Sequence, residues 1–444
     1  IVNFKKSWFL HDNLSNNDIL DIDYLKQIEE KYLINLHLIA LNDRMFNELN
    51  TFHHFSHDEI LLILQNEIKL FEEVLDEVNP DFIIMPISHQ QHNHIFQEIC
   101  KSRKIKILMA VDSRIGIDAN SKSYVTRRYF ISDDLDPHVT LPTTVSTNLS
   151  TTDPVFDKNY DYHFQSSNKE YLKAIFKFLI SSDENVKTLY SYFGRKKIKV
   201  IFKMFAYELR KKYRSNFMNK NLPIKILRDH ENYVYLALHQ EMERILLIGA
   251  PFYINQFQNI KHISSSLPIG YKLIVKDHPE MVVRGWRSVN EMKEIMKLPN
   301  VILLHPMANS NEIIDQSKLV ISIRGSTSIE AVFRKKPSII FGKVGMYRLS
   351  NMTLVTSLLE LPNYIKQALN QKINEEEIEL YKKSVYENTF DFPLHEIEVG
   401  FEQQFKSGGY YQNTEIESTK MLEFLKQNEN ELSFLAKKFI EKMK

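Results

Sequence analysis

Short apolar segments alternate with helix-like segments between residues 233 and 341, and this alternation restricts the fold more than any other feature of the sequence. The apolar segments, which we predict to be strands, are residues 233–238, 271–276, 301–304, 319–323 and 338–341. The segments with helical spacing between them are residues 255–266, 289–297, 311–316 and 328–334. Strands alternating with helices at these lengths predict parallel βαβ units, and therefore a Rossmann-like half.

A similar alternation occurs near the beginning of the chain. Residues 58–78 have apolar side chains at three- to four-residue spacing, which predicts an amphipathic helix that ends at Asn79-Pro80. Residues 81–86 and 105–110 then predict two buried strands, with a helix at 93–103 between them. We expect a second set of parallel βαβ units here.

The length of 444 residues suits two or three domains. We predict an N-terminal Rossmann-like domain at 1–165, a basic helical linker at 166–230, a C-terminal Rossmann-like domain at 231–370, and a helical tail at 371–444 that packs back on the N-terminal domain. Two such halves with a helical tail form the plan called GT-B, in which substrates lie in the cleft between the halves.

Charge and cysteine content exclude several classes of protein. Lys plus Arg is 57 and Asp plus Glu is 56, a balance that gives no support to a general nucleic-acid binder. The single cysteine, Cys100, excludes a disulfide framework and a Cys-based metal site, and fits a reducing cytoplasm. No apolar run of about 18 residues predicts a membrane span. The chain opens Ile1-Val2-Asn3-Phe4, without Met or a signal sequence, so we expect a trimmed chain or a fragment.

Residues 195–214 combine nine Lys or Arg with one acidic residue, Glu208, and with several apolar side chains. We expect a helix here, and two interpretations are open. It is either a solvated linker between the halves or a helix that lies on an anionic membrane surface, where each cation contributes about 1 kcal/mol.

Lys276, His278 and Pro279 follow one of the predicted strands. Ligands of open parallel sheets bind beyond the carboxyl ends of the strands, so Lys276 and His278 could neutralise and hydrogen-bond a phosphate there, with Pro279 fixing the turn. The alternative is that His278-Pro279 simply ends the strand.

A second strand end carries Arg324, Gly325, Ser326, Thr327 and Ser328 before a predicted helix. A glycine turn, three hydroxyls and a helix N-terminus make an anion site, and Glu330 could accept both hydroxyls of a ribose. The alternative is a capping box of Thr327 with Glu330, which satisfies the helix end without a ligand; Asn309 and Glu312 have the same spacing one helix earlier.

Other polar groups complete the candidate site. His239 and Glu243 follow the strand at 233–238 and could act as acid, base or sugar-binding groups, or belong to a solvated loop. Asp112, from the first half, is a third catalytic candidate, and Arg114 is a candidate for acceptor binding. His305 is more typical of a structural histidine. The histidines at 89, 92 and 94 lack metal-site spacing, so we expect them to line the cleft and expect no metal or other cofactor.

The motifs Leu238-His239-x-x-x-Glu243, Val275-Lys276-Asp277-His278-Pro279 and Gly325-Ser326-Thr327-Ser328-Ile329-Glu330-Ala331, followed by Lys336-Pro337-Ser338, resemble those of bacterial capsule-polysaccharide glycosyltransferases. The resemblance covers about 233–367. More distantly, it extends to sialyl- and Kdo-transferases that use CMP-sugars. In such families an HP motif and a Ser/Thr motif hold the nucleotide. This chain differs in having Arg324 before the glycine and Met242 where the family usually has proline.

The resemblance implies a glycosyltransferase that uses a nucleotide-sugar donor and a capsular or other surface polysaccharide, or its lipid-linked primer, as acceptor. The N-terminal domain would take the acceptor and the C-terminal domain the donor. The transition state would be oxocarbenium-like, with Lys276, His278 and the helix start at 326–328 neutralising the leaving phosphate. We expect a CMP-sugar rather than a UDP-sugar, although Arg324 would suit a diphosphate. A nucleotide-sugar 2-epimerase and a non-catalytic scaffold in a capsule assembly complex are the alternatives. The expected location is the cytoplasm or the inner face of the membrane.

Overall fold

The computed structural model describes residues 5–10, 19–46, 50, 52–88, 90–117, 126–133, 175–176, 178–180, 193–194, 196–225, 232–240, 244–284, 287–344, 347–405 and 416–443. The strands are β1 (Phe82–Ile84), β2 (Lys106–Ile117), β3 (Thr126–Ser132), β4 (Asn232–Ala237), β5 (Tyr271–Lys276), β6 (Val301–Leu304), β7 (Leu319–Ser322), β8 (Ser338–Ile340), β9 (Met352–Leu354) and β10 (Phe390–Phe392). The helices of the first part are α1 (Ile22–Tyr32), α2 (Leu36–Leu41), α3 (His57–Val78), α4 (Gln91–Ser102) and α6 (Lys197–Asn221). Those that follow are α7 (Arg244–Leu247), η5 (Pro251–Tyr253), α8 (Gln256–Ser266), α9 (Met281–Arg284), α10 (Val289–Met296), α11 (Ser310–Gln316), α12 (Ser326–Phe333), η6 (Leu358–Glu360), α13 (Leu361–Asn370), α14 (Glu375–Asn388), α15 (Leu394–Phe405), α16 (Ser418–Gln427) and α17 (Glu429–Met443).

The second half contains a six-stranded parallel sheet in the order β6-β5-β4-β7-β8-β9. Its strands are apolar on both faces because helices cover both. On one face Val234, Leu236 and Val275 pack with Ile260 and Ile263 of α8. On the other, Tyr233, Tyr235 and Ile274 pack with Ile313 and Ile314 of α11. The five strands predicted from the sequence are confirmed, and β9 is an additional edge strand.

The first half contains a smaller sheet in the order β1-β2-β3-β10. Helix α3 begins with a capping box between Ser56 and Glu59, and β1 and β2 pair in parallel across α4, as predicted. The sheet then departs from the Rossmann-like expectation, since β2 pairs with β3 and β3 with β10 in antiparallel fashion. The predicted strand at 105–110 continues to Ile117, because β3 gives the additional residues a hydrogen-bonding partner.

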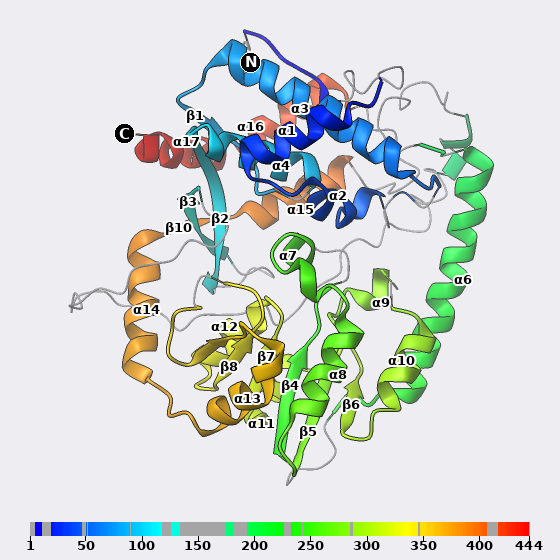
Figure 1. Ribbon diagram of the computed structural model, residues 1–444, viewed down its shortest axis with the longest axis vertical. Helices are drawn as coiled ribbons and strands as arrows, with labels where there is room; N and C mark the ends of the chain where they lie inside the picture. Colours follow the sequence, from blue (N-terminus) through cyan, green and yellow to red (C-terminus); the bar gives the residue numbers. More distant parts are fainter. Residues whose placement is uncertain are drawn as a thin grey trace.

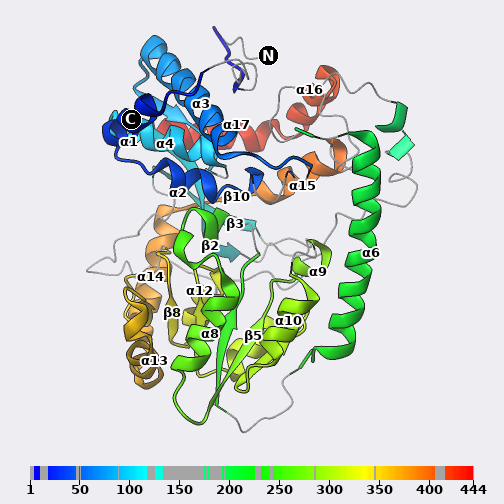
Figure 2. The ribbon, with the colours of Figure 1, turned by 45° about the vertical axis from the view of Figure 1, so that its right-hand side comes forward.

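The two halves share an apolar core. Ile115 of β2 and Phe130 of β3 pack with Ile329 of α12, Ile340 of β8 and Tyr381 of α14. Two helices also cross between the halves, α6 on one side of the molecule and α14 on the other (Figure 1). Figure 2 shows that α6 runs along the outside of the molecule for its whole length.

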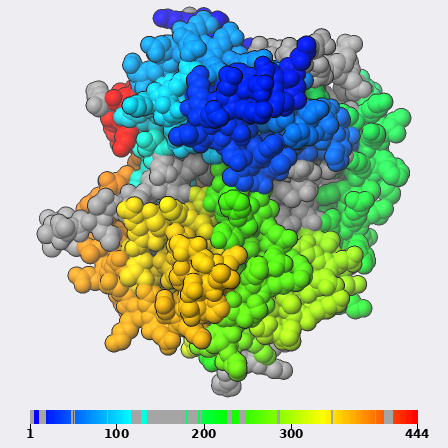
Figure 3. Space-filling model, in the orientation of Figure 1, coloured from blue at the N-terminus to red at the C-terminus, as the bar shows by residue number. Residues whose placement is uncertain are grey.

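After α14 the chain returns to the first half, where β10 pairs with β3 and α15 and α17 follow. Phe439 of α17 packs against Leu108 and Ile131 of the first sheet. The protein is thus a mixed α/β molecule with two sheets, a connecting helix and a helical tail that returns to the first sheet, which is the GT-B organisation predicted from the sequence. In the space-filling view the first half (blue and cyan) lies against the second (green and yellow) (Figure 3).

Candidate active site at the carboxyl edge of the six-stranded sheet

Three strands of the second sheet end side by side. Ala237 of β4 pairs with Lys276 of β5 on one side and with Ser322 of β7 on the other. The segments that follow these residues therefore meet at one edge of the sheet, and they carry His239, His278 and Arg324. The structure brings together the strand-end motifs that the sequence singled out, at the edge where parallel sheets bind ligands.

His239 is buried, and its ring connects the end of β4 to the end of β7 through hydrogen-bonding contacts. Nε2 accepts a hydrogen bond from the backbone N–H of Arg324 at 3.0 Å and lies 3.3 Å from Oγ of Ser322. Burial, the charge of Arg114 and then that of His278 lower the pKa of His239 to about 3, so the ring is neutral at pH 7. A neutral ring whose Nε2 already accepts a backbone N–H favours a positioning role over the acid–base role that the sequence suggested.

The Gly325 turn is shaped by this histidine. A Cβ at residue 325 would lie 2.6 Å from Oγ of Ser322 and 3.0 Å from Cε1 of His239, so only glycine fits without a shift. The backbone N–H of Gly325 donates to Oγ of Ser322 at 2.7 Å.

Helix α12 begins at Ser326, two residues earlier than a capping box of Thr327 would require. Its N-cap is Gly325, without a side-chain cap, so the capping-box interpretation of Thr327 and Glu330 is wrong. Asn309 does cap the preceding helix α11, as the sequence suggested. Ser328 Oγ instead donates to the carbonyl of Gly325 at 2.6 Å. The first turn of α12 thus has no capping side chain, and helix N-termini attract anions.

Glu330 lies one turn into α12, where its side chain forms a hydrogen bond with Ser326. Burial raises the pKa of Glu330, while Ser326, Arg334, Lys276 and Arg127 act in the opposite direction. Glu330 is therefore close to a cation from each sheet, Lys276 and Arg127.

Lys276 is buried at the last position of β5. Its ammonium donates to Oγ of Ser310 at 3.0 Å, and Ser310 also forms a hydrogen bond with Tyr235. Burial lowers the pKa of Lys276 to about 8, against the opposing charges of Asp277 and Glu330. The side chain is still mainly cationic at pH 7. The next residue, Asp277, does not share this site: both of its oxygens bind the guanidinium of Arg287, at 2.6 and 3.2 Å.

His278 and Pro279 form the turn after β5. The Nδ1 atom of His278 lies 3.3 Å from Nε2 of Gln240 and accepts from the backbone N–H of Glu280 at 3.3 Å. With Nδ1 as the acceptor, the ring proton of the neutral form is on Nε2. The carbonyls of His278 and Pro279 accept from Met281 and Val282, which starts the short helix α9. The motif ends the strand and also places an imidazole at the edge of the sheet.

Arg114 of the first half reaches the same edge. The register of β2 and β3 shifts between Asp112 and Gly116, and Arg114 has the left-handed backbone of φ 61° within this bulge. Its guanidinium Nη1 donates to the carbonyl of Arg324 at 3.1 Å. Bulges next to active sites commonly re-aim a side chain, and this one directs Arg114 at the second half.

Asp112 holds this bulge and binds a second arginine. One oxygen accepts from the backbone N–H of Arg114 at 2.7 Å, and the other accepts from Arg127 Nη1 at 2.6 Å. Arg127 also acts on Glu330 across the two halves. Sequence reasoning missed Arg127 and Ser310, because each joins the site through a partner that is distant in the chain. The arginine-rich start of β3 was the only signal for Arg127.

Arg324 is buried, and its Nε donates to the carbonyl of Lys343 at 2.6 Å.

Two of the candidate residues, Glu243 and His305, are not placed in this cluster. Glu243 lies outside the described residues. His305 has a structural role: Nε2 is 3.1 Å from Oδ1 of Asn219, and Nδ1 accepts from Met307. These contacts join the end of β6 to α6.

A small cavity of about 50 Å³ lies between the halves. It is lined from the first half by Asp43, Arg44, Gln91 and His94, and from the second by Leu247 and Pro251. Of the three histidines expected to line the cleft, His94 faces this boundary between the halves, and His89 lies outside the described residues. In the described part of the chain no group of three or more His, Cys, Asp or Glu side chains could hold a metal ion. Likewise, no helix within the described ranges has the length and apolar character needed to cross a membrane.

No family model matches this chain, and no curated protein does. Among solved structures, it is similar to the beta Kdo 2,7 transferase KpsC of Thermosulfurimonas dismutans, with 10% identity over 81% of this chain and 86% of that one and a TM-score of 0.32. The UDP-GlcNAc 2-epimerase of Methanocaldococcus jannaschii has 13% identity over 79% and 84%, with a TM-score of 0.26. The spinosyn rhamnosyltransferase SpnG has 14% identity over 35% of this chain and only 42% of its own length, with a TM-score of 0.26. TM-scores this low carry no argument about function, which must come from the site itself.

Proposed function

We propose that the protein is a glycosyltransferase that moves a sugar from a nucleotide donor to a surface polysaccharide or its lipid-linked primer. One observation carries the proposal. The uncapped start of α12, Lys276 and Glu330 of the second half meet Arg114 and Arg127 of the first half at the carboxyl edge of the parallel sheet.

Each part of this edge suits one part of a nucleotide-sugar. The first-turn N–H groups of α12 and the hydroxyls of Ser326 and Thr327 bind phosphate oxygens, and Lys276 supplies the charge that stabilises the leaving phosphate. Glu330 accepts hydrogen bonds from ribose hydroxyls. Nε2–H of His278 donates to the donor phosphate. None of these roles calls for a metal.

The reaction also needs a carboxylate or imidazole on the acceptor side. We assign this role to Asp112, because the arginine that binds it also acts on Glu330 and so places Asp112 near the donor edge. Arg114 lies beside it and orients the acceptor. Glu243, which follows β4, is a second candidate carboxylate. His239 supports the Gly325 turn instead.

We favour a CMP-sugar over a UDP-sugar. The charge of Arg324 would suit a diphosphate, but Nε of Arg324 already donates to the carbonyl of Lys343. A single phosphate needs less compensation than two, and Lys276 with one helix N-terminus suits it better.

Calorimetric binding of CMP, UDP, GDP, CDP and ADP, with and without divalent metal, tests the proposal. CMP should bind most tightly and without metal. Lys276→Met should weaken binding by about 1.5–3 kcal/mol, the value of a hydrogen bond to a charged group. Lys272→Met, at the other end of the same strand, is the control and should bind normally. Binding of none of the five nucleotides would contradict the proposal, and a preference for UDP would change only the donor.

Turnover separates the transferase from its alternatives. Incubation of a nucleotide-sugar without acceptor should leave the sugar unchanged, whereas an epimerase would convert it. His278→Ala should abolish transfer to an acceptor while leaving the unfolding midpoint near that of the parent protein.

A further inference from the structure

Helix α6 has an apolar face that no part of the chain within the described residues covers. Five large side chains are exposed: Ile198 84%, Phe202 74%, Phe205 65%, Leu209 55% and Tyr213 62%. They recur every three or four residues, so they form one stripe along the helix, about 22 Å long at 1.5 Å per residue. We define these five residues as the α6 stripe.

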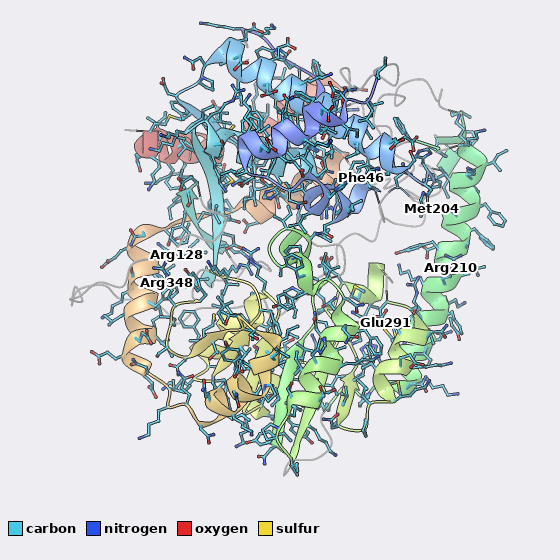
Figure 4. All side chains as sticks on the ribbon, viewed as in Figure 1. Phe46, Arg128, Met204, Arg210, Glu291 and Arg348 are labelled. Carbon is cyan, nitrogen blue, oxygen red and sulfur yellow. The ribbon has the colours of Figure 1, made fainter. Side chains whose placement is uncertain are left out.

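The opposite side of α6 is the side that packs on the protein. Val200 and Met218 are its buried residues, and Met218 belongs to the core of the second half. The α6 stripe therefore points away from the molecule, along the outer edge that Figure 2 shows. Met204 and Arg210 mark the helix in Figure 4.

Cations flank the α6 stripe. The helix contains eight Lys or Arg residues and one acidic residue, Glu208. Lys199 and Arg210 are exposed next to one side of the stripe and Lys212 next to the other. Burial lowers the pKa of Lys203, and the charges of Lys199 and Arg210 lower it further.

From the exposed stripe and its flanking cations we propose that α6 binds an anionic lipid surface, with the α6 stripe inserted among the acyl chains and the cations on the headgroups. An amphipathic helix with aromatic and leucine side chains on one face and Lys or Arg beside them has the chemistry of interfacial membrane helices. A second copy of this chain fits less well, because two such faces would bring their lysines and arginines together.

The position of α6 relates the proposed lipid binding to the proposed reaction. Helix α6 connects the two halves, so a membrane along its outer face would lie beside both of them (Figure 1). A lipid-linked acceptor would then be held near the enzyme by the same surface. The lipid binding itself does not depend on which nucleotide the protein uses.

Co-sedimentation of the full chain with vesicles tests this inference. The protein should bind vesicles that contain phosphatidylglycerol and bind pure phosphatidylcholine at least 100-fold more weakly, since neutral lipid removes the attraction of all the cations at about 1 kcal/mol each. The triple change Phe202→Ser, Phe205→Ser and Leu209→Ser should abolish binding to both. The triple change Lys199→Gln, Arg210→Gln and Lys212→Gln should weaken binding to anionic vesicles about fivefold per charge, or about 100-fold in all, and should reduce its sensitivity to salt.

Two controls use exposed residues elsewhere. Ile269→Ser with Leu359→Ser removes apolar side chains that are more exposed than those of the stripe, and Lys366→Gln with Lys372→Gln removes exposed cations. Both pairs should bind vesicles as the parent protein does. Equal or negligible binding of the parent protein to both kinds of vesicle would overturn the inference. So would a dimer in sedimentation velocity that the triple serine change converts to a monomer, since a second copy would then cover the stripe. Nucleotide binding measured on the same variants should be unchanged, so a failure here is distinguishable from a failure of the proposed function.

Discussion

His239 contributes to the site through a bond to the backbone rather than through its own protonation. Its ring accepts the N–H of Arg324 and contacts Ser322, and the turn at Gly325 is built against it. Protonation of Nε2 would break the bond to Arg324 and place a charge in a buried position. The structure of the turn that we propose binds phosphate therefore depends on a neutral histidine.

This dependence predicts an acid-sensitive contribution to stability. Burial lowers the folded-state pKa of His239 to about 3, whereas the unfolded value is about 6.5. The stabilisation is thus fully present above pH 6.5 and is lost as the pH falls toward 3, because only the unfolded chain takes up the proton in that range. Between pH 7 and pH 5 the parent protein should lose about 2 kcal/mol more stability to urea than His239→Gln does. His262→Gln, on the surface of α8, should match the parent; equal losses for all three proteins would contradict the assignment.

Lys276 illustrates the opposite balance between stability and binding. Its ammonium is buried at a pKa of about 8, and burying a cation opposes folding unless a ligand or partner compensates. We predict that Lys276→Met leaves the thermal midpoint unchanged or raises it, although nucleotide binding falls. Differential scanning calorimetry checks the midpoint. A midpoint lower by more than a few degrees would contradict this prediction. It would show that the buried Lys276 stabilises the fold, through its hydrogen bond to Ser310, rather than opposing folding.

At the scale of elements, the strand–glycine–helix unit of β7, Gly325 and α12 determines the geometry of the proposed phosphate site. Gly325→Ala would place a methyl group 2.6 Å from Oγ of Ser322 and 3.0 Å from the ring of His239. We expect a loss of about 1–3 kcal/mol in unfolding free energy, which is typical of overpacking. We also expect nucleotide binding to fall by a larger fraction than the unfolding free energy does. Gly400→Ala is the control, since its methyl would contact Phe424 at 3.8 Å without a clash. Gly400 lies in the middle of α15, where alanine in place of glycine should raise the unfolding free energy by up to about 1 kcal/mol. Denaturant titration should separate the two, and a neutral Gly325→Ala would contradict the tight fit.

The elements also show which structure the sequence could predict. The runs at 233–238 and 301–304 are apolar throughout, and those at 271–276 and 319–323 are interrupted only by Lys272, Lys276 and Ser322. Such runs between helices indicate strands that are covered on both faces. β10 has three residues and pairs with β3 about 260 positions earlier, so no local sequence pattern predicts it. The same limit applies to the site. Lys276, His278 and Gly325 lie next to recognisable strand ends, whereas the roles of Arg127 and Ser310 exist only because folding brings distant segments into contact.

At the scale of the whole molecule, the β2–β3 ribbon makes the two halves share a core. Ile115 is fully buried among residues of α12, β8 and α14, and Arg128 of β3 bonds to Asp391 and to the backbone carbonyls of Tyr386 and Thr389. Figure 4 shows Arg128 at the boundary between the halves. The groups that we propose bind the acceptor and the donor are therefore positioned by one continuous interior, which makes their relative placement a property of the whole fold.

A shared interior predicts that the halves unfold together. Three isoleucines, each fully buried, test this: Ile95 in the core of the first half, Ile263 in the core of the second, and Ile115 between them. Each change to alanine should cost about 2–5 kcal/mol, and because the halves are coupled each should lower the midpoint of one common calorimetric transition. If the halves were independent, Ile95→Ala and Ile263→Ala would each shift a different transition. CMP binding provides a complementary measurement. A ligand that binds only the folded protein raises the midpoint of the part of the protein that unfolds together with the binding site. With coupled halves, saturating CMP should raise the midpoint of Ile95→Ala as much as that of Ile263→Ala, even though residue 95 lies in the half that does not carry α12.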